Sequence, residues 1–183
     1  LSAAAVQGRE FNLAVTCGAL DTTVDRVADA FDAAERAWLI RAEAGVSGRY
    51  RFVHALVRQT LLDELSSLRR SRLHLSIAST LSHRHAAPTQ EVALRIAGHF
   101  LDAAAVGGLP RAVDFLDRSD ESGSSAVLDL AIRALADADD VGLDDRRRVL
   151  LHVMVAKSAW LARNDRELTD RSFAEAVRLA DAL

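Results

Sequence analysis

Proline and glycine are scarce in this sequence, with two prolines and nine glycines among 183 residues. Both residues disfavour helices, whereas alanine, the best helix former, accounts for 34 positions. The composition therefore predicts a mainly helical protein. Because half of the residues are hydrophobic and 27% are charged, a disordered, collagen-like or low-complexity chain is excluded.

Cysteine and long apolar runs are also nearly absent. Cys17 is the only cysteine, so no disulfide forms within the chain, and we expect a small core residue in a cytoplasmic protein. The longest uncharged stretch, 73–83, has 11 residues and is too short to span a bilayer, which takes about 20. Residues 1–10 lack the features of a signal peptide, and the chain begins with Leu1 rather than methionine, as a piece of a longer protein would.

Net positive charge is absent as well, because the formal net charge is −3. This argues against a general binder of nucleic acid or anionic membranes. Residues 21–37, the candidate recognition helix, hold five acidic and two basic side chains, so we expect no specific DNA binding. Residues 49–72 hold six arginines, which either face an anion or are structural. Residues 102–145 hold 11 acidic and three basic side chains, which form a solvated surface or attract a basic partner.

The N-terminal part combines short helices with one strand pair. A helix is predicted over 22–38, capped by Thr22 and Asp25, with a buried stripe that ends at Trp38. A shorter apolar helix is predicted over 11–20. Both lie before the predicted strands.

Residues 39–41 and 50–53 are predicted to form a β-hairpin around the glycine-containing turn at 44–48. This hairpin is the only strand signal in the sequence, and Phe52 is expected in the core. Helices followed by a hairpin favour a winged-helix-like domain over 1–65.

Helical periodicity resumes at His54 and continues to the end of the chain. We expect connecting helices over 66–108, with Thr89 capping one of them, and helical repeats over 109–183. The predicted helical pairs are 110–122 with 125–138, and 145–163 with 166–182. Five residues of the second pair occupy positions typical of a 34-residue tetratricopeptide-like unit: Val153, Ala156, Trp160, Phe173 and Ala176. The predicted fold is therefore all-α with one small hairpin, a winged-helix-like domain followed by an α-solenoid.

Sequence motifs for catalysis are missing. The phosphate-binding loop, the dinucleotide fingerprint, the zinc-protease motif and the nucleophile elbow do not occur. The six histidines lack the cysteine or carboxylate spacing of a metal site, and His152 is expected at a helix boundary without partners. We expect no catalytic residues, no metal and no enzyme activity in this chain.

Two segments carry a resemblance to a known family. Residues 48–65 read GRYRFVHALVRQTLLDEL and residues 68–74 read LRRSRLH. Together they resemble the segment after the nucleotide-binding domain in bacterial signal-transduction ATPases of the STAND class, especially large LuxR-type and cyclase-linked transcriptional regulators. In that family the first segment ends a winged-helix domain and the second opens the helix that leads to tetratricopeptide-like repeats. Residues 4–11, AAVQGREF, look like the entry to the winged helix. The resemblance is close over 1–82 and loose over 90–183.

The resemblance implies a regulatory segment whose ATPase core lies upstream in the intact protein, while the terminal helix-turn-helix of the family is also missing here. In the family a histidine at the end of the wing contacts the ADP β-phosphate, and His54 stands at that place, although Ala55 replaces the aspartate of the family motif. His54 is thus either a contact to nucleotide, ADP or ATP being bound by the upstream domain, or a cap for the following helix. The implied partners are that ATPase domain and a protein or small-molecule effector on the repeats. The alternative is a freestanding helical scaffold with no nucleotide role.

Overall fold

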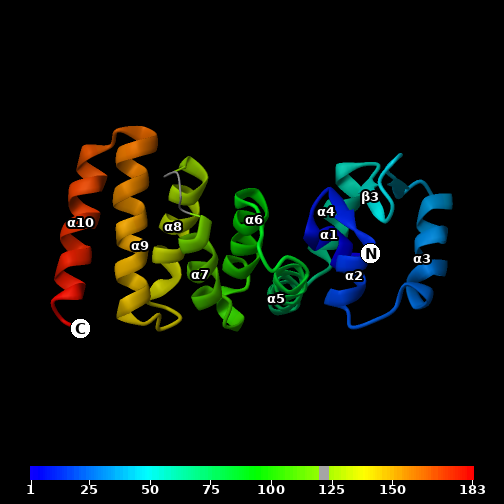
Figure 1. Cartoon of the computed structure of the whole chain (residues 1–183). Coiled ribbons are helices and arrows are strands. Elements are labelled where there is room, and N and C mark those ends of the chain that lie inside the picture. Colours follow the sequence, from blue (N-terminus) through cyan, green and yellow to red (C-terminus); the bar gives the residue numbers. More distant parts are fainter. Residues whose placement is uncertain (120–123) are drawn as a thin grey trace. The chain divides into compact units, whose positions relative to one another are not determined.

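A computed structural model describes residues 1–119 and 124–183, which form two compact units, 1–84 and 85–183 (Figure 1). The end of the helix predicted over 110–122 lies outside the described residues. Each unit is described by itself. The structure is mainly helical with one small sheet, as predicted from the composition.

The first unit has the element order of a winged helix. Its elements are α1 (Ser2–Gln7), β1 (Glu10–Asn12), α2 (Leu13–Ala19), α3 (Val24–Arg36), β2 (Ile40–Ala42), β3 (Arg49–Phe52), α4 (Ala55–Asp63) and α5 (Ser67–Arg84). The antiparallel sheet has the order β1-β3-β2. Phe11 pairs with Tyr50, and Ile40 pairs with Phe52, so β3 is the central strand. The predicted hairpin is confirmed as the β2–β3 pair.

Strand β1 was not predicted, because a helix was expected from Phe11 onward. The Asn12 side chain accepts hydrogen bonds from the backbone N–H groups of Ala14 and Val15, at 2.9 and 3.2 Å, and so caps α2. An N-cap residue is itself extended, and this lets the residues before it pair with β3. The helix therefore starts at Leu13, two residues later than expected.

An aromatic cluster holds the sheet against α3. The ring centroid of Phe11 lies 5.0 Å from that of Phe52 and 6.1 Å from that of Phe31 on α3, and Tyr50 completes the cluster. Phe52 is fully buried, as predicted. Edge-to-face and offset arrangements of this kind add to the stabilisation from burial alone.

Trp38 is not a core residue, contrary to the sequence prediction, because 63% of its surface is exposed. Helix α3 ends at Arg36, and the N–H of Leu39 reaches back to the carbonyl of Ala34 at 2.9 Å. This Schellman ending places Trp38 at the left-handed position, with φ of 58°, and turns its ring out of the stripe. The predicted cap is also wrong, since Thr23 is the N-cap and makes no side-chain capping bond.

Helices α4 and α5 complete the first unit. The Arg58 side chain on α4 donates to the carbonyl of Ala5 on α1 at 2.8 Å. Helix α5 packs on α1 and α2, where Gly18 permits close approach, since a Cβ there would lie 2.6 Å from the Thr80 methyl group. Cys17 is buried in α2, as expected.

The second unit is a succession of antiparallel helices in which each packs on the next. Its elements are α6 (Gln90–Leu101), the 3₁₀ turn η1 (Ala104–Val106), α7 (Leu109–Ser119), α8 (Ser125–Ala138), α9 (Asp145–Ser158), the π-helical turn η2 (Ala159–Arg163) and α10 (Arg166–Ala180). The Thr89 side chain caps α6, as predicted. The two predicted helical pairs are α7 with α8, and α9 with α10.

The repeat positions differ in their burial. Ala156 and Ala176 are buried, whereas Val153, Trp160 and Phe173 are 44%, 52% and 61% exposed. The small residues of the repeat pattern therefore lie in the helix interfaces. The large ones lie on the surface of the part of the chain that the structure describes.

Replacing Phe52 with alanine is expected to lower the free energy of unfolding by about 3–5 kcal/mol, because a fully buried ring leaves a cavity. The matched variant Trp38→Ala removes a larger but exposed side chain, whose main contact is the Arg41 guanidinium 5.3 Å from its ring. It should cost less than about 1 kcal/mol. Urea unfolding of both variants checks this expectation, and equal losses would contradict the assigned strand register.

Candidate functional site

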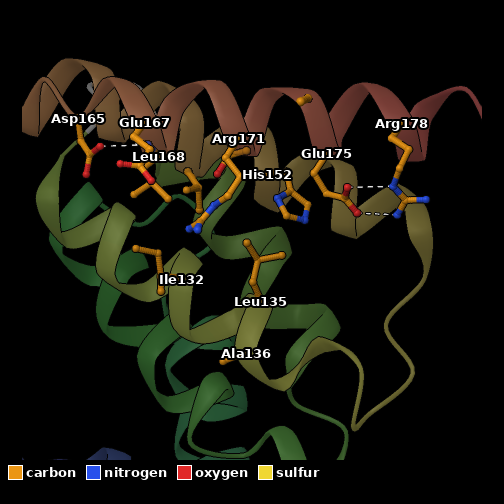
Figure 2. Close-up of a pocket in the computed structure, with 13 residues that line it drawn as sticks. Ile132, Leu135, Ala136, His152, Asp165, Glu167, Leu168, Arg171, Glu175 and Arg178 are labelled. Atoms are coloured by element: carbon orange, nitrogen blue, oxygen red, sulfur yellow. Dashed lines mark hydrogen bonds and ion pairs between the residues drawn. The ribbon is translucent and has the colours of Figure 1, made fainter.

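A groove of about 1100 Å³ runs between α8 and α10 in the second unit, with α9 at its base (Figure 2). Its lining residues are Ile132, Leu135, Ala136, His152, Val155, Asp165, Glu167, Leu168, Arg171, Ser172, Ala174, Glu175 and Arg178. This volume is slightly above the usual range for small-molecule sites, about 300–1,000 Å³. The groove is therefore the candidate functional site of the second unit.

Aliphatic side chains form much of the groove surface. Ile132 and Leu135 come from α8, Val155 from α9 and Leu168 from α10. Ile132 is 39% exposed, and Leu168 is partly exposed. An apolar ligand placed here would remove this surface from water, which is the main source of affinity in such sites.

Helix α10 brings its charged residues to the groove through helical spacing. Leu168, Arg171, Glu175 and Arg178 follow one another at steps of three or four residues, which places them on one face. The Asp165 carboxylate starts the helix by accepting a hydrogen bond from the N–H of Leu168 at 3.0 Å. The sequence thus fixes both the start of α10 and the face that it turns to α8.

Most of the acidic lining is already engaged within α10. Glu175 accepts two hydrogen bonds from the Arg178 guanidinium, at 2.9 and 2.5 Å. These bonds hold the pKa of Glu175 below its usual value and raise the pKa of Arg178. Arg171, in contrast, forms no hydrogen bond or ion pair with any residue that the structure describes. Figure 2 shows its side chain extending from α10 toward α8, over Ile132 and Leu135.

His152 lies inside α9 rather than at a helix boundary, which corrects the sequence prediction. It is half-buried, and its Nδ1 is buried without a hydrogen-bond partner among the described residues. Burial lowers the pKa of His152 below its usual 6.5; Glu175 opposes this shift, whereas Arg148 and Arg178 add to it. The imidazole is therefore neutral at neutral pH.

His54, the residue singled out from the sequence, lies in the other unit. It is the N-cap residue of α4 and is exposed, with extended backbone angles, but its side chain makes no capping hydrogen bond. Within the described residues its imidazole has no hydrogen-bond or ion-pair partner. The structure thus places His54 on the surface at the end of β3, available to a ligand or a partner.

The arginine-rich segment 49–72 divides between structural and exposed side chains. Arg58 and Arg70 donate to the carbonyls of Ala5 and Leu62, at 2.8 and 2.6 Å, and link neighbouring helices. Arg49 lies 3.7 Å from Glu43. The structural interpretation therefore holds for these three arginines.

The acidic segment 102–145 is partly neutralised by arginines from later helices. Three aspartates pair with an arginine 31 to 34 residues further along the chain, at 2.7 to 3.2 Å: Asp102 with Arg133, Asp114 with Arg147, and Asp129 with Arg163. Such surface pairs add little stability, about 0–1 kcal/mol each. Their separations of 31, 33 and 34 residues are close to the length of one helical repeat. The pairs also reduce the net negative charge of this segment, which was considered as an attraction for a basic partner.

Neither a metal site nor a membrane span is found in the described ranges. No three histidine, cysteine, aspartate or glutamate side chains of residues 1–119 and 124–183 are grouped to hold a metal ion. No helix among these residues has both the length and the apolar character needed to cross a bilayer. No protein-family model, curated protein or solved structure matches this chain.

The groove itself was not predicted from the sequence. The helical spacing of Leu168, Arg171 and Glu175 can be recognised in the sequence. This spacing does not indicate a groove, because helices with one charged and one apolar face are common on protein surfaces. Only the packing of α8 and α10 on α9 brings the three helices around one cavity.

The lowered pKa of His152 predicts a pH dependence of stability. Between pH 6.5 and the lower pKa of His152 in the folded protein, this side chain binds a proton more readily in the unfolded chain than in the folded one. The free energy of unfolding therefore decreases as the pH falls through this window. The variant His152→Gln should lose less stability than the wild type between about pH 7.5 and about pH 5.5. The matched control is His83→Gln at an exposed position on α5. Urea unfolding at both pH values gives the comparison, and identical pH dependence of wild type and His152→Gln would contradict this account.

Proposed function

We propose that this chain is the regulatory segment of an intracellular, ATP-dependent transcriptional regulator, in which it couples the nucleotide state to binding of an effector. The observation that carries the proposal is the element order of residues 1–52 with the sheet order β1-β3-β2, which is that of a winged helix. Helical pairs with a ligand-sized groove follow it in the chain. This arrangement supports what the segments 48–65 and 68–74 imply.

The nucleotide side of the proposal depends on His54. His54 is exposed and makes no capping hydrogen bond to α4, so its imidazole is accessible to a phosphate group held by a neighbouring domain. An imidazole donates a hydrogen bond to phosphate oxygen, which is stronger when the imidazole is charged. The nucleotide, ADP in the resting state, would be held by an upstream ATPase domain.

The effector side depends on the groove of the second unit, which is large enough for a small molecule and carries Arg171, a cation without a partner among the described residues, over an apolar surface. The described residues offer no metal cluster, and the sequence lacks a phosphate-binding loop. ATP hydrolysis is therefore assigned to the upstream domain, and the chain itself acts by binding.

DNA recognition is not assigned to this chain. In a winged helix the third helix is the usual reading element, and here α3 holds four acidic and two basic side chains. Because affinity for DNA comes largely from neutralised phosphates, α3 would be repelled from the duplex. The winged helix is proposed to contact the nucleotide-bearing domain instead.

The second candidate function is a freestanding scaffold that binds a protein partner without nucleotide. The exposed large apolar side chains of Trp160, Phe173 and Val177 favour it, since apolar surface on α10 and its preceding turn suits a protein interface. The DNA upstream of Leu1 separates the two candidates. An in-frame phosphate-binding loop supports the regulator, whereas a nearby stop codon supports the scaffold.

The direct test replaces His54 with alanine in the protein that includes the upstream ATPase domain. Loss of one hydrogen bond to a charged group is expected to weaken ADP binding about ten- to hundredfold. The melting temperature should stay unchanged, because the His54 side chain caps nothing in α4. The matched control is His83→Ala, a substitution of another exposed histidine. Unchanged ADP affinity in the folded His54 variant would refute the nucleotide role.

A further inference from the structure

We propose that the groove between α8 and α10 binds an aliphatic carboxylate, whose carboxylate group pairs with Arg171 and whose hydrocarbon chain lies on Ile132, Leu135 and Leu168. This inference rests on the proposed function, which assigns effector binding to this groove, and it adds the chemical class of that effector. The binding itself requires only the second unit of the chain.

The shape of the groove suits an elongated small molecule. The lining residues of α10 run from Asp165 to Arg178, which at the rise of an α-helix spans about 20 Å. The volume of about 1100 Å³ is close to that of drug-sized ligand sites, which is about 300–1,000 Å³. We therefore assign a small molecule rather than a protein as the occupant.

One arginine of the groove is left for a ligand, although acidic residues outnumber arginines in the lining. Asp165 is used as a helix cap, and Glu175 is paired with Arg178. Arg171 has no partner among the described residues, and Figure 2 shows it over the aliphatic side chains of α8. A guanidinium presents parallel N–H donors that match the two oxygens of a carboxylate.

Glu167 is a carboxylate on the same helix as Arg171, although the two form no ion pair in the part of the chain that the structure describes. It lies one helical turn before Arg171 and is exposed. A pair of exposed side chains at this spacing is weak, because water screens both charges. A ligand carboxylate gains in addition from the apolar contacts of its chain, and no pair with Glu167 has to be broken for it to reach Arg171.

His152 also lines the groove. Its buried Nδ1 has no partner among the described residues, so a hydrogen-bonding position of the ring is unused. Because burial keeps the ring neutral at neutral pH, it accepts or donates one hydrogen bond without adding charge.

The apolar surface predicts how affinity depends on chain length. Burying one methylene group strengthens binding about fourfold, the equivalent of about 0.8 kcal/mol. Affinity should therefore rise by about this factor per carbon from hexanoate to octanoate to decanoate. Octanamide, which is neutral, and octylamine, which is cationic, should bind more weakly than octanoate.

The experiment is calorimetric titration of the 183-residue chain with these five ligands, repeated on three folded variants. Arg171→Gln should weaken octanoate about tenfold and leave octanamide unchanged. Glu167→Gln should strengthen octanoate about twofold, since it removes a nearby negative charge. The matched control is Arg166→Gln, which makes the same charge change on α10 outside the groove and should have no effect.

Three results would overturn the inference: no octanoate binding at millimolar concentration, equal binding of octylamine, or equal octanoate affinity in wild type and Arg171→Gln. Tighter binding of the neutral peptide N-acetyl-trileucine amide than of decanoate would overturn the assignment of a carboxylate ligand. Failure of the proposed function has a different signature. If octanoate binds as described but does not alter nucleotide affinity in the protein with its ATPase domain, the groove assignment stands and the coupling does not.

Discussion

The close packing of α9 against its two neighbours is the constraint on which the groove depends. Alanines occupy these interfaces, among them Ala131 and Ala134 on α8, Ala156 and Ala159 at the end of α9, and Ala176 on α10, all of them buried. Small side chains let helix axes approach closely, because interaxial distance is set by the residues at the contact. Helix α9 therefore lies deep between α8 and α10, and the space left above it is the groove.

Charge in the second unit follows the same arrangement of consecutive helices. Aspartates on one helix meet arginines about one repeat later, as Asp114 and Arg147 do on α7 and α9. Arg133, Arg147 and Arg163 form such pairs, and Arg178 is held by Glu175. Arg171 stands apart because it faces an aliphatic surface rather than a carboxylate of a neighbouring helix.

The sequence predicted the elements that local patterns determine, and it missed those that depend on distant contacts. Helical periodicity and the cap at Thr89 correctly predicted the helices of the second unit. The glycine-containing turn correctly predicted the β2–β3 hairpin. Strand β1 was missed because its partner strand lies some forty residues later in the chain. The exposure of Trp38 was missed because the Schellman ending of α3 turns this residue away from the buried face that the helical periodicity predicted. The groove was missed because its lining residues come from three helices whose arrangement periodicity does not encode.

The most direct test of the account is a map of ligand contacts by methyl NMR of the 183-residue chain. On addition of octanoate, the account predicts chemical-shift changes at the methyl groups of Ile132, Leu135 and Leu168. The methyl groups of Ile40 and Leu62 in the first unit should not change, since neither lines the groove. Shifts confined to the first unit, or spread evenly over exposed leucines such as Leu56, would contradict the assignment of the α8–α10 groove as the effector site.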